Sequence, residues 1–225
     1  MTAKLPMLGL PVLLLLAAGC SNTRTVRVEV PPRMDLRGYA TVGLVGFSSN
    51  ARGDLDRMST ERFLRAVQNA QPGTRVVELG SERDVLASIG RRSWDREAFR
   101  RVGEEHGVEA IVIGRLNVER EKPDVRFSTF DLKRLSVRQD VNAELTARVV
   151  EAPSGATVWT DGAQCTGNLA HASFNDRGEG HFGANDPEEA YGEMIDGLVW
   201  NVTDAFRPHY VTRRVPKHEA VASVE

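Results

Sequence analysis

The residues that could carry metal or acid–base chemistry gather in one stretch of the chain. His171, Asp176, Glu179 and His181 supply the side chains that metals prefer. They lie in a glycine-rich stretch rather than at helical i, i+4 spacing, which holds ligands poorly, so a solvated loop over residues 167–185 is favoured. Nucleophile-elbow, phosphate-loop, zinc-helix and paired-cysteine motifs do not occur in the sequence. We therefore predict no catalytic residue, metal or cofactor and no enzyme; a hydrolase using this loop is the less favoured reading.

The two cysteines call for different interpretations. Cys165 falls within an apparent strand, Thr160 to Thr166, where a small buried residue is more common than a reactive thiol. A nucleophilic thiol would need a histidine and an orienting partner, and the sequence cannot place either beside it. Cys20 instead ends an apolar segment at the start of the chain.

The first twenty residues have the order of a secretory signal. Lys4 precedes an apolar run, Leu5 to Ala18, and small residues follow before Cys20. This run is shorter than the roughly 20 residues that span a bilayer as a helix. We predict that residues 1–19 are a signal peptide.

The end of that segment, Leu16-Ala17-Ala18-Gly19-Cys20, resembles the lipobox of bacterial lipoproteins, with Ala17 where leucine is more common. The resemblance implies cleavage before Cys20, thioether acylation of its sulfur and acylation of its new amine, which is enough lipid for stable anchoring. Ser21 then favours the periplasmic face of the outer membrane, because aspartate there is the usual inner-membrane signal. An ordinary signal peptide with an incidental cysteine is the alternative.

Composition limits the remaining function classes. The chain has 225 residues, with 29 Lys or Arg against 31 Asp or Glu, a formal charge of −2 and 41% hydrophobic residues. These values are typical of a globular protein and give no support for nucleic-acid binding. Residues 140–206 are acidic, which indicates a solvated face or, alternatively, a docking face for a basic partner.

The first half of the body alternates strands and helices. Val42–Phe47 and Arg75–Leu79 are short apolar strands, and Asp54 to Ala70 has the 3.6-residue spacing of an amphipathic helix. Ser81 suits the N-cap of a short helix ending at Ile89, and Ser93 or Asp95 starts another that ends before Gly107.

The second half contains a hairpin and a last helix. After the apolar strand Val108–Gly114, Val141 to Val149 alternates apolar and polar residues, as in a half-buried strand. Pro153-Ser154-Gly155 turns it into the next strand, and Asp186 begins a helix that continues to Phe206.

These elements predict an α/β fold, a single compact domain with helices packed on a mixed sheet and a C-terminal β-hairpin plus helix. We assign residues 20–38 to the lipidated N-terminus and a short tether, in which Thr25–Val30 alternates as a strand does, and residues 39–206 to the domain. Residues 207–225 form a polar, frayed tail, and residues 119–138 are charge-rich and unassigned.

Several of these segments are similar to bacterial outer-membrane lipoproteins with a curli-secretion-channel-like domain, a domain shared with the lipoprotein activators of penicillin-binding proteins. The matching segments are Val42–Phe47, Arg75–Glu78, Val102–Gly114 and Leu145–Trp159, within roughly residues 38–206. The resemblance implies a mixed α/β fold and no invariant catalytic chemistry.

Two features separate this chain from the best-known members of that family. Channel members insert membrane hairpins where this chain has residues 119–138 and 167–185, and each lipid-facing Lys or Arg would cost about 2–4 kcal/mol at the midplane. Activators use a long tether, whereas the roughly 18 residues here reach at most about 60 Å. We therefore expect neither a pore nor a synthase activator.

The favoured function is that of an adaptor or assembly factor for envelope proteins, with an unidentified periplasmic or outer-membrane protein as partner. A ring-forming homo-oligomeric subunit of a secretion-related assembly is the alternative. Binding energy in such interfaces concentrates in arginine and aromatic side chains. We expect these in two loops, at Arg91, Arg92, Trp94, Phe174 and Phe182, although the three aromatic residues could instead pack under their loops.

Overall fold

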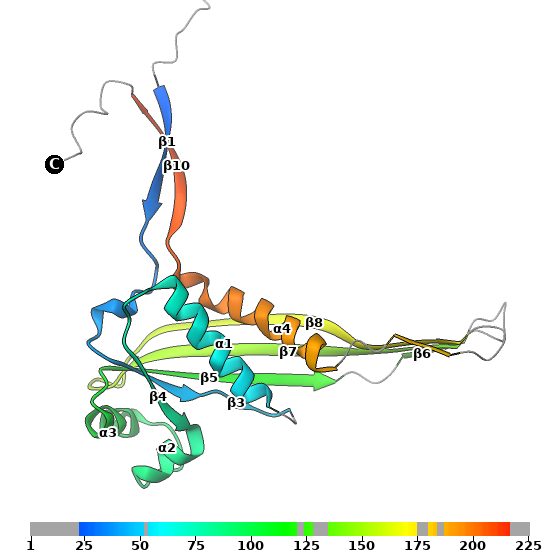
Figure 1. Ribbon diagram of the computed structural model, residues 1–225. Coiled ribbons are helices and arrows are strands. Elements are labelled where there is room, and N and C mark those ends of the chain that lie inside the picture. The colour runs from blue at the N-terminus through cyan, green and yellow to red at the C-terminus, as the bar shows by residue number, and fades with distance from the viewer. Residues whose placement is uncertain are drawn as a thin grey trace, which may run out of the picture. The chain divides into compact units, whose positions relative to one another are not determined.

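The computed structural model describes residues 23–51, 54–120, 124–127, 135–174, 180–183 and 187–216, with side chains described outside 120–140 and 168–190. This part of the chain divides into two compact units (Figure 1). The larger runs from Pro31 to Pro208, and the smaller contains the segments on either side of it.

The larger unit is a mixed α/β fold, as predicted. Its described strands form an 8-stranded sheet in the order β4-β2-β5-β7-β8-β9, with β3 pairing β5 and β6 pairing β7. The strands are β2 (Val42–Gly46), β3 (Ser48–Ser49), β4 (Val76–Ser81), β5 (Ala110–Arg120), β6 (Asp124–Phe127), β7 (Leu135–Glu151), β8 (Thr157–Phe174) and β9 (Gly180–Gly183). The helices are α1 (Leu55–Ala70), α2 (Glu82–Ser88), α3 (Arg96–His106) and α4 (Pro187–Val202), with short 3-10 helices η1 (Leu36–Gly38) and η2 (Thr203–Phe206). No helix in the described ranges has the length and apolarity needed to cross a membrane.

Three parallel strands make one end of the sheet. Val42 of β2 pairs with Val76 of β4 on one side and with Ala110 of β5 on the other, both in parallel register. Parallel neighbours need crossover connections. Helix α1 supplies the crossover from β2 to β4, and α2 with α3 supplies the crossover from β4 to β5.

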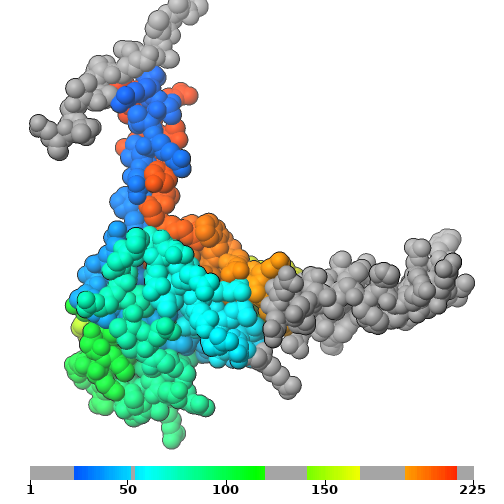
Figure 2. Space-filling model, viewed as in Figure 1, coloured from blue at the N-terminus to red at the C-terminus, as the bar shows by residue number. Residues whose placement is uncertain are grey.

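Helices cover both faces of this part of the sheet. Consecutive strand residues point to opposite faces, so Leu44 packs in one buried cluster with residues of α1 and α4. Its neighbour Val45 packs in a second cluster with residues of α2 and α3. Helices α1 and α4 lie side by side over the first face, as the cyan and orange surfaces of Figure 2 show.

The other part of the sheet is the predicted antiparallel hairpin, β7 with β8. Val141, Leu145 and Val149 are buried while Thr146 between them is exposed, so the alternation read from the sequence is confirmed. Helix α4 packs over both strands of this hairpin.

Two expected irregular segments are instead paired strands. The predicted loop over residues 167–185 is wrong, because β8 continues to Phe174 and β9 pairs back on it, with His171 opposite Gly183. The unassigned segment 119–138 contains β6 and the start of β7. Neither stretch has a continuous apolar face in the sequence. Backbone hydrogen bonds to a long neighbouring strand do not require one.

The smaller unit corrects the predicted tether and tail. Strands β1 (Thr23–Val30) and β10 (His209–Pro216) form an antiparallel ribbon, with Thr23 opposite Pro216 and Val30 opposite His209. The frayed tail expected from residue 207 is therefore wrong along β10. Pairing between segments so far apart in sequence cannot be read from either segment alone.

Candidate functional site

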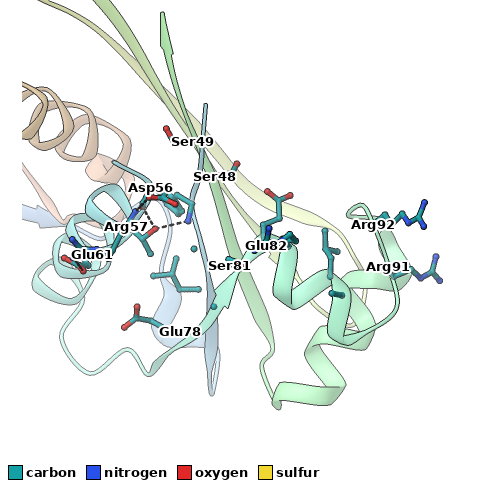
Figure 3. A pocket seen from close by; sticks show the side chains of 18 residues that line it. Ser48, Ser49, Asp56, Arg57, Glu61, Glu78, Ser81, Glu82, Arg91 and Arg92 are labelled. Carbon is teal, nitrogen blue, oxygen red and sulfur yellow. Dashed lines mark hydrogen bonds and ion pairs between the residues drawn. The ribbon is translucent and has the colours of Figure 1, made fainter. Parts of the chain in front are cut away.

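A cleft of about 1050 Å³ opens where the parallel strands β2 and β4 end. Asp56, Arg57 and Glu61 of α1 lie along one side, and Glu82 of α2 with Arg91 and Arg92 lies along the other (Figure 3). The connections from β2 and β4 leave towards opposite faces of the sheet. Open α/β sheets bind ligands at such a switch point, outside the carboxyl ends of the strands.

Close backbone approach forms the cleft floor. The pairing of β2 with β4 shifts register between Leu44 and Val45, so that Val45 lies opposite Gly80. Gly80 has φ +95°, a conformation that other residues rarely adopt. A Cβ on Gly46 would come within 3.2 Å of the Gly80 carbonyl oxygen. Glycines at these two positions thus allow the ends of β2 and β4 to approach closely at the cleft floor.

Thr60 ties the end of β2 to helix α1. Its buried Oγ1 accepts the N–H of Phe47 at 2.8 Å and donates to the Asp56 carbonyl at 2.7 Å. The backbone N–H that emerges from β2 is therefore satisfied by the helix that follows. This bond fixes the α1 side of the cleft relative to the strand.

Two of the cleft arginines, Arg57 and Arg91, are paired with carboxylates in or next to the cleft. Arg57 bonds Asp54 and Glu61, each at 2.9 Å, and these carboxylates raise the pKa of its guanidinium. Arg91 bonds Asp95 at 3.0 Å. Arg92 is exposed and has no hydrogen-bond or ion-pair partner among the described residues. It is therefore the cleft arginine best able to bind the carboxylate of another molecule.

The hydroxyl of Ser81 is occupied by helix capping. It accepts the N–H of Asp84 at 3.2 Å and donates to the Asp84 carboxylate at 2.7 Å. A nucleophilic serine needs a neighbouring base that takes its proton. Here the Asp84 carboxylate instead completes the predicted N-cap of α2. Ser81 therefore stabilises the start of this helix and does not act as a nucleophile.

The predicted contact residues fall in different places. Arg91 and Arg92 line the cleft. Trp94 lies outside it, half-buried, with its ring stacked on Phe99 at 4.7 Å between centroids, and it lines an adjoining depression that shares Arg92.

The two predicted phenylalanines lie at the far end of the sheet. Phe174 ends β8 opposite Gly180, and Phe182 in β9 lies opposite Ala172. The side chains of both fall outside the described residues.

The remaining candidates for chemistry are placed as follows. Cys165 is half-buried on β8 with its Sγ 3.9 Å from the Met194 carbonyl, and burial raises the pKa of its thiol, which disfavours the reactive thiolate. His171 and His181 stand on the paired strands β8 and β9, with their side chains outside the described part. Among the described residues, no three His, Cys, Asp or Glu side chains are grouped to hold a metal ion.

The sequence analysis missed most of the cleft. Ser48, Asp56, Glu61 and Glu78 come from three separate elements and match no motif. One signal could have found them. Each lies at or just after the carboxyl end of a predicted strand, or in the first turns of the following helix, and the carboxyl ends of parallel strands meet at one edge of a sheet.

No family model matches the chain, and no curated protein is similar enough to align with it. Among solved structures, the PelC dodecamer from Paraburkholderia phytofirmans is similar at 8% identity and a TM-score of 0.40, covering 82% of this chain and 98% of that one. Lipoprotein GNA1162 from Neisseria meningitidis is similar at 10% identity and a TM-score of 0.40, over 70% of this chain and 94% of that one. The C-terminal domain of LpoB from Salmonella enterica follows at 11% identity and a TM-score of 0.35, over 60% and 84%.

Proposed function

We propose that this chain is a lipid-anchored protein of the bacterial outer membrane that faces the periplasm and binds a protein partner as an adaptor, without catalysis. The lipobox-like sequence ending at Cys20 supports the anchor. Ser21 supports the outer membrane. The cleft supports the binding role.

The observation that carries the adaptor role is an open sheet edge beside the cleft. Strand β4 has β2 as its only strand neighbour within the described ranges, and its residues Glu78 and Gly80 line the cleft. Val77 is 40% exposed on the same strand. An extended peptide can add to such an edge through main-chain hydrogen bonds, with pockets selecting its side chains.

The cleft chemistry fits a peptide better than a small substrate. Its volume of about 1050 Å³ is at the upper limit of the roughly 300–1,000 Å³ of small-molecule sites, and it lies beside a strand edge that a peptide could extend. Arg57 and Arg91 are already paired with carboxylates, which leaves the exposed Arg92 for a carboxylate of the partner. Arg91, Arg92 and Trp94 form the proposed contact surface, and Phe174 and Phe182 remain proposed contacts at the far end of the sheet.

The anchor is tested by Cys20→Ser. This change removes the only sulfur that could carry the diacylglyceryl group, so we expect loss of fatty-acid labelling and release from the membrane fraction. Ser21→Asp is the matched control, because it should keep labelling and shift the protein towards the inner membrane. Labelling that persists in Cys20→Ser contradicts the assignment.

The partner site is tested by photo-crosslinking in intact cells. A photoreactive residue at position 92 should capture one dominant protein, and Arg92→Glu should reduce co-purification of that protein without lowering the melting temperature. The same photoreactive residue at Arg101, exposed on α3 and outside the cleft, is the control. Equal capture from both positions, or none from position 92, would count against the cleft.

A ring-forming subunit is the second candidate, favoured by the other sheet edge. Along Thr157–Gly167, β8 pairs with β7 on one side and with no other described strand. Light scattering of the lipid-free chain separates the two candidates. A monomer rules out a ring built by edge pairing, whereas a closed oligomer of fixed mass supports it.

A further inference from the structure

The ribbon of β1 and β10 has one apolar face, which is partly exposed. Directly opposed residues in an antiparallel pair share a face, and the register places five valines together: Val26, Val28, Val30, Val211 and Val215. We call this set the valine face. Val28 is 37% exposed there, and the other four valines are half-buried.

The opposite face of the ribbon is polar, and several of its side chains interact with one another. The guanidinium of Arg27 lies 4.3 Å from the centroid of the Tyr210 ring, and the Tyr210 hydroxyl donates to Glu29 at 3.3 Å. Thr25, Thr212 and Arg214 share this face. The ribbon is therefore amphipathic, with one polar side whose groups bond one another and one partly exposed apolar side.

Two arginines flank the valines on their own face. Arg24 lies opposite Val215, and Arg213 lies opposite Val26. Both are exposed, and neither has a partner within the described chain. The ribbon as a whole carries four arginines against one glutamate, a net charge of +3, whereas the full chain carries −2.

The combination of valines and arginines on this face suits an anionic membrane surface better than it suits burial inside a protein. Arginine side chains can lay their apolar stems along a hydrophobic surface while the guanidinium reaches phosphate, which it binds through two hydrogen bonds. Valines between them would enter the boundary between headgroups and acyl chains. A two-stranded ribbon alone is marginally stable in water, so such a surface would also stabilise it.

The proposed lipid anchor brings that surface within reach. Strand β1 begins at Thr23, three residues after Cys20, and three residues span at most about 10 Å. We propose that the valine face, with Arg24 and Arg213, docks on anionic phospholipid headgroups next to the anchor. This inference rests on the proposed lipidation of Cys20.

The test uses the mature chain, residues 20–225, with Cys20→Ser, so that no acyl chain contributes. Sedimentation with vesicles of phosphatidylglycerol and phosphatidylcholine should show binding that vesicles of phosphatidylcholine alone do not. Arg24→Gln with Arg213→Gln should weaken binding about 30-fold, at about fivefold for each arginine near an anionic surface. Arg27→Gln with Arg214→Gln removes the same charge from the opposite face, about a Debye length further from the lipid, and should weaken it much less.

A second measurement reports which face meets the lipid. Val28→Trp places an indole on the valine face and Thr212→Trp places one on the polar face; both residues suit a strand. Brominated lipid should quench the added fluorescence at position 28 and leave that at position 212 unchanged.

Three results would overturn the proposal: no binding to anionic vesicles, equal losses from the two arginine pairs, or equal quenching at both positions. A concentration-dependent dimer that Val28→Asp dissociates, without vesicle binding, would assign the face to a second copy of the chain. Failure of fatty-acid labelling in the wild-type protein would refute the anchor and leave these vesicle results standing, so the two failures are distinguishable.

Discussion

At the C-terminal end of α1 the side chain of Gln71 is 1% exposed, whereas at the N-terminal end the guanidinium of Arg57 is 63% exposed. Gln71 accepts the N–H of Leu36 at 2.8 Å and donates to the carbonyls of Met34 and Phe206 at 2.5 and 3.0 Å. Arg57 bonds two carboxylates in solvent. The polar groups at one end hold the fold together, and those at the other end line a cleft that a partner can reach.

Replacing the buried amide should have the largest effect. Gln71→Leu leaves one N–H and two carbonyls without partners inside the body, and each such group costs about 1–3 kcal/mol. We expect a loss of about 3 kcal/mol or more in the free energy of unfolding, measured by urea denaturation of the lipid-free chain. A change as small as that of an exposed substitution would show that water replaces the amide. The two ends of α1 would then not differ in their contribution to stability.

Thr60→Val tests the point where the cleft joins the core. The shapes are nearly equal, but the N–H of Phe47 loses its acceptor, so we expect a loss of about 1–3 kcal/mol. The same urea titration measures it, and Thr212→Val, exposed on the ribbon, is the matched control. A similar loss from the control would mean that the hydroxyl is not responsible.

Arg57→Gln should lower the urea midpoint only slightly, because exposed ion pairs contribute little to stability. The side chain lines the cleft, so co-purification of the partner is the second readout. A clear drop in the midpoint would show that the α1 side of the cleft belongs to the structural framework rather than to the accessible surface.

The smallest effect is expected from the exposed ion pairs of α3. Hydrogen bonds from Arg100 and Arg101 lower the pKa of Glu97 from 4.5 to about 2. Because the folded-state pKa lies below the unfolded one, the contribution is complete above about pH 4.5 and is lost as the pH falls towards 2. The pH dependence of the urea midpoint in wild type and Glu97→Gln should differ slightly over that window, with Glu105→Gln as the control. Identical profiles would mean that the pairs do not persist in solution.

Local signals in the sequence predicted the helices well. Asp95 caps α3 by accepting the N–H of Ala98 at 2.7 Å, and Gly107 closes it with φ +64°. Capping and periodicity act within a few residues, so they can be read directly from the chain. The strand β7 was predicted for the same reason, because its alternation records burial on one face.

The sequence by itself determined the caps, the apolar strands and the mixed α/β class, since each depends on neighbouring residues. Only the tertiary structure decided the β1–β10 ribbon, the continuation of β8 to Phe174 and the meeting of Arg92 with Glu61 around one cleft. These features depend on strand pairing between distant segments. Backbone hydrogen bonds supply that pairing, and the side-chain pattern of a strand does not reveal which distant strand it pairs with.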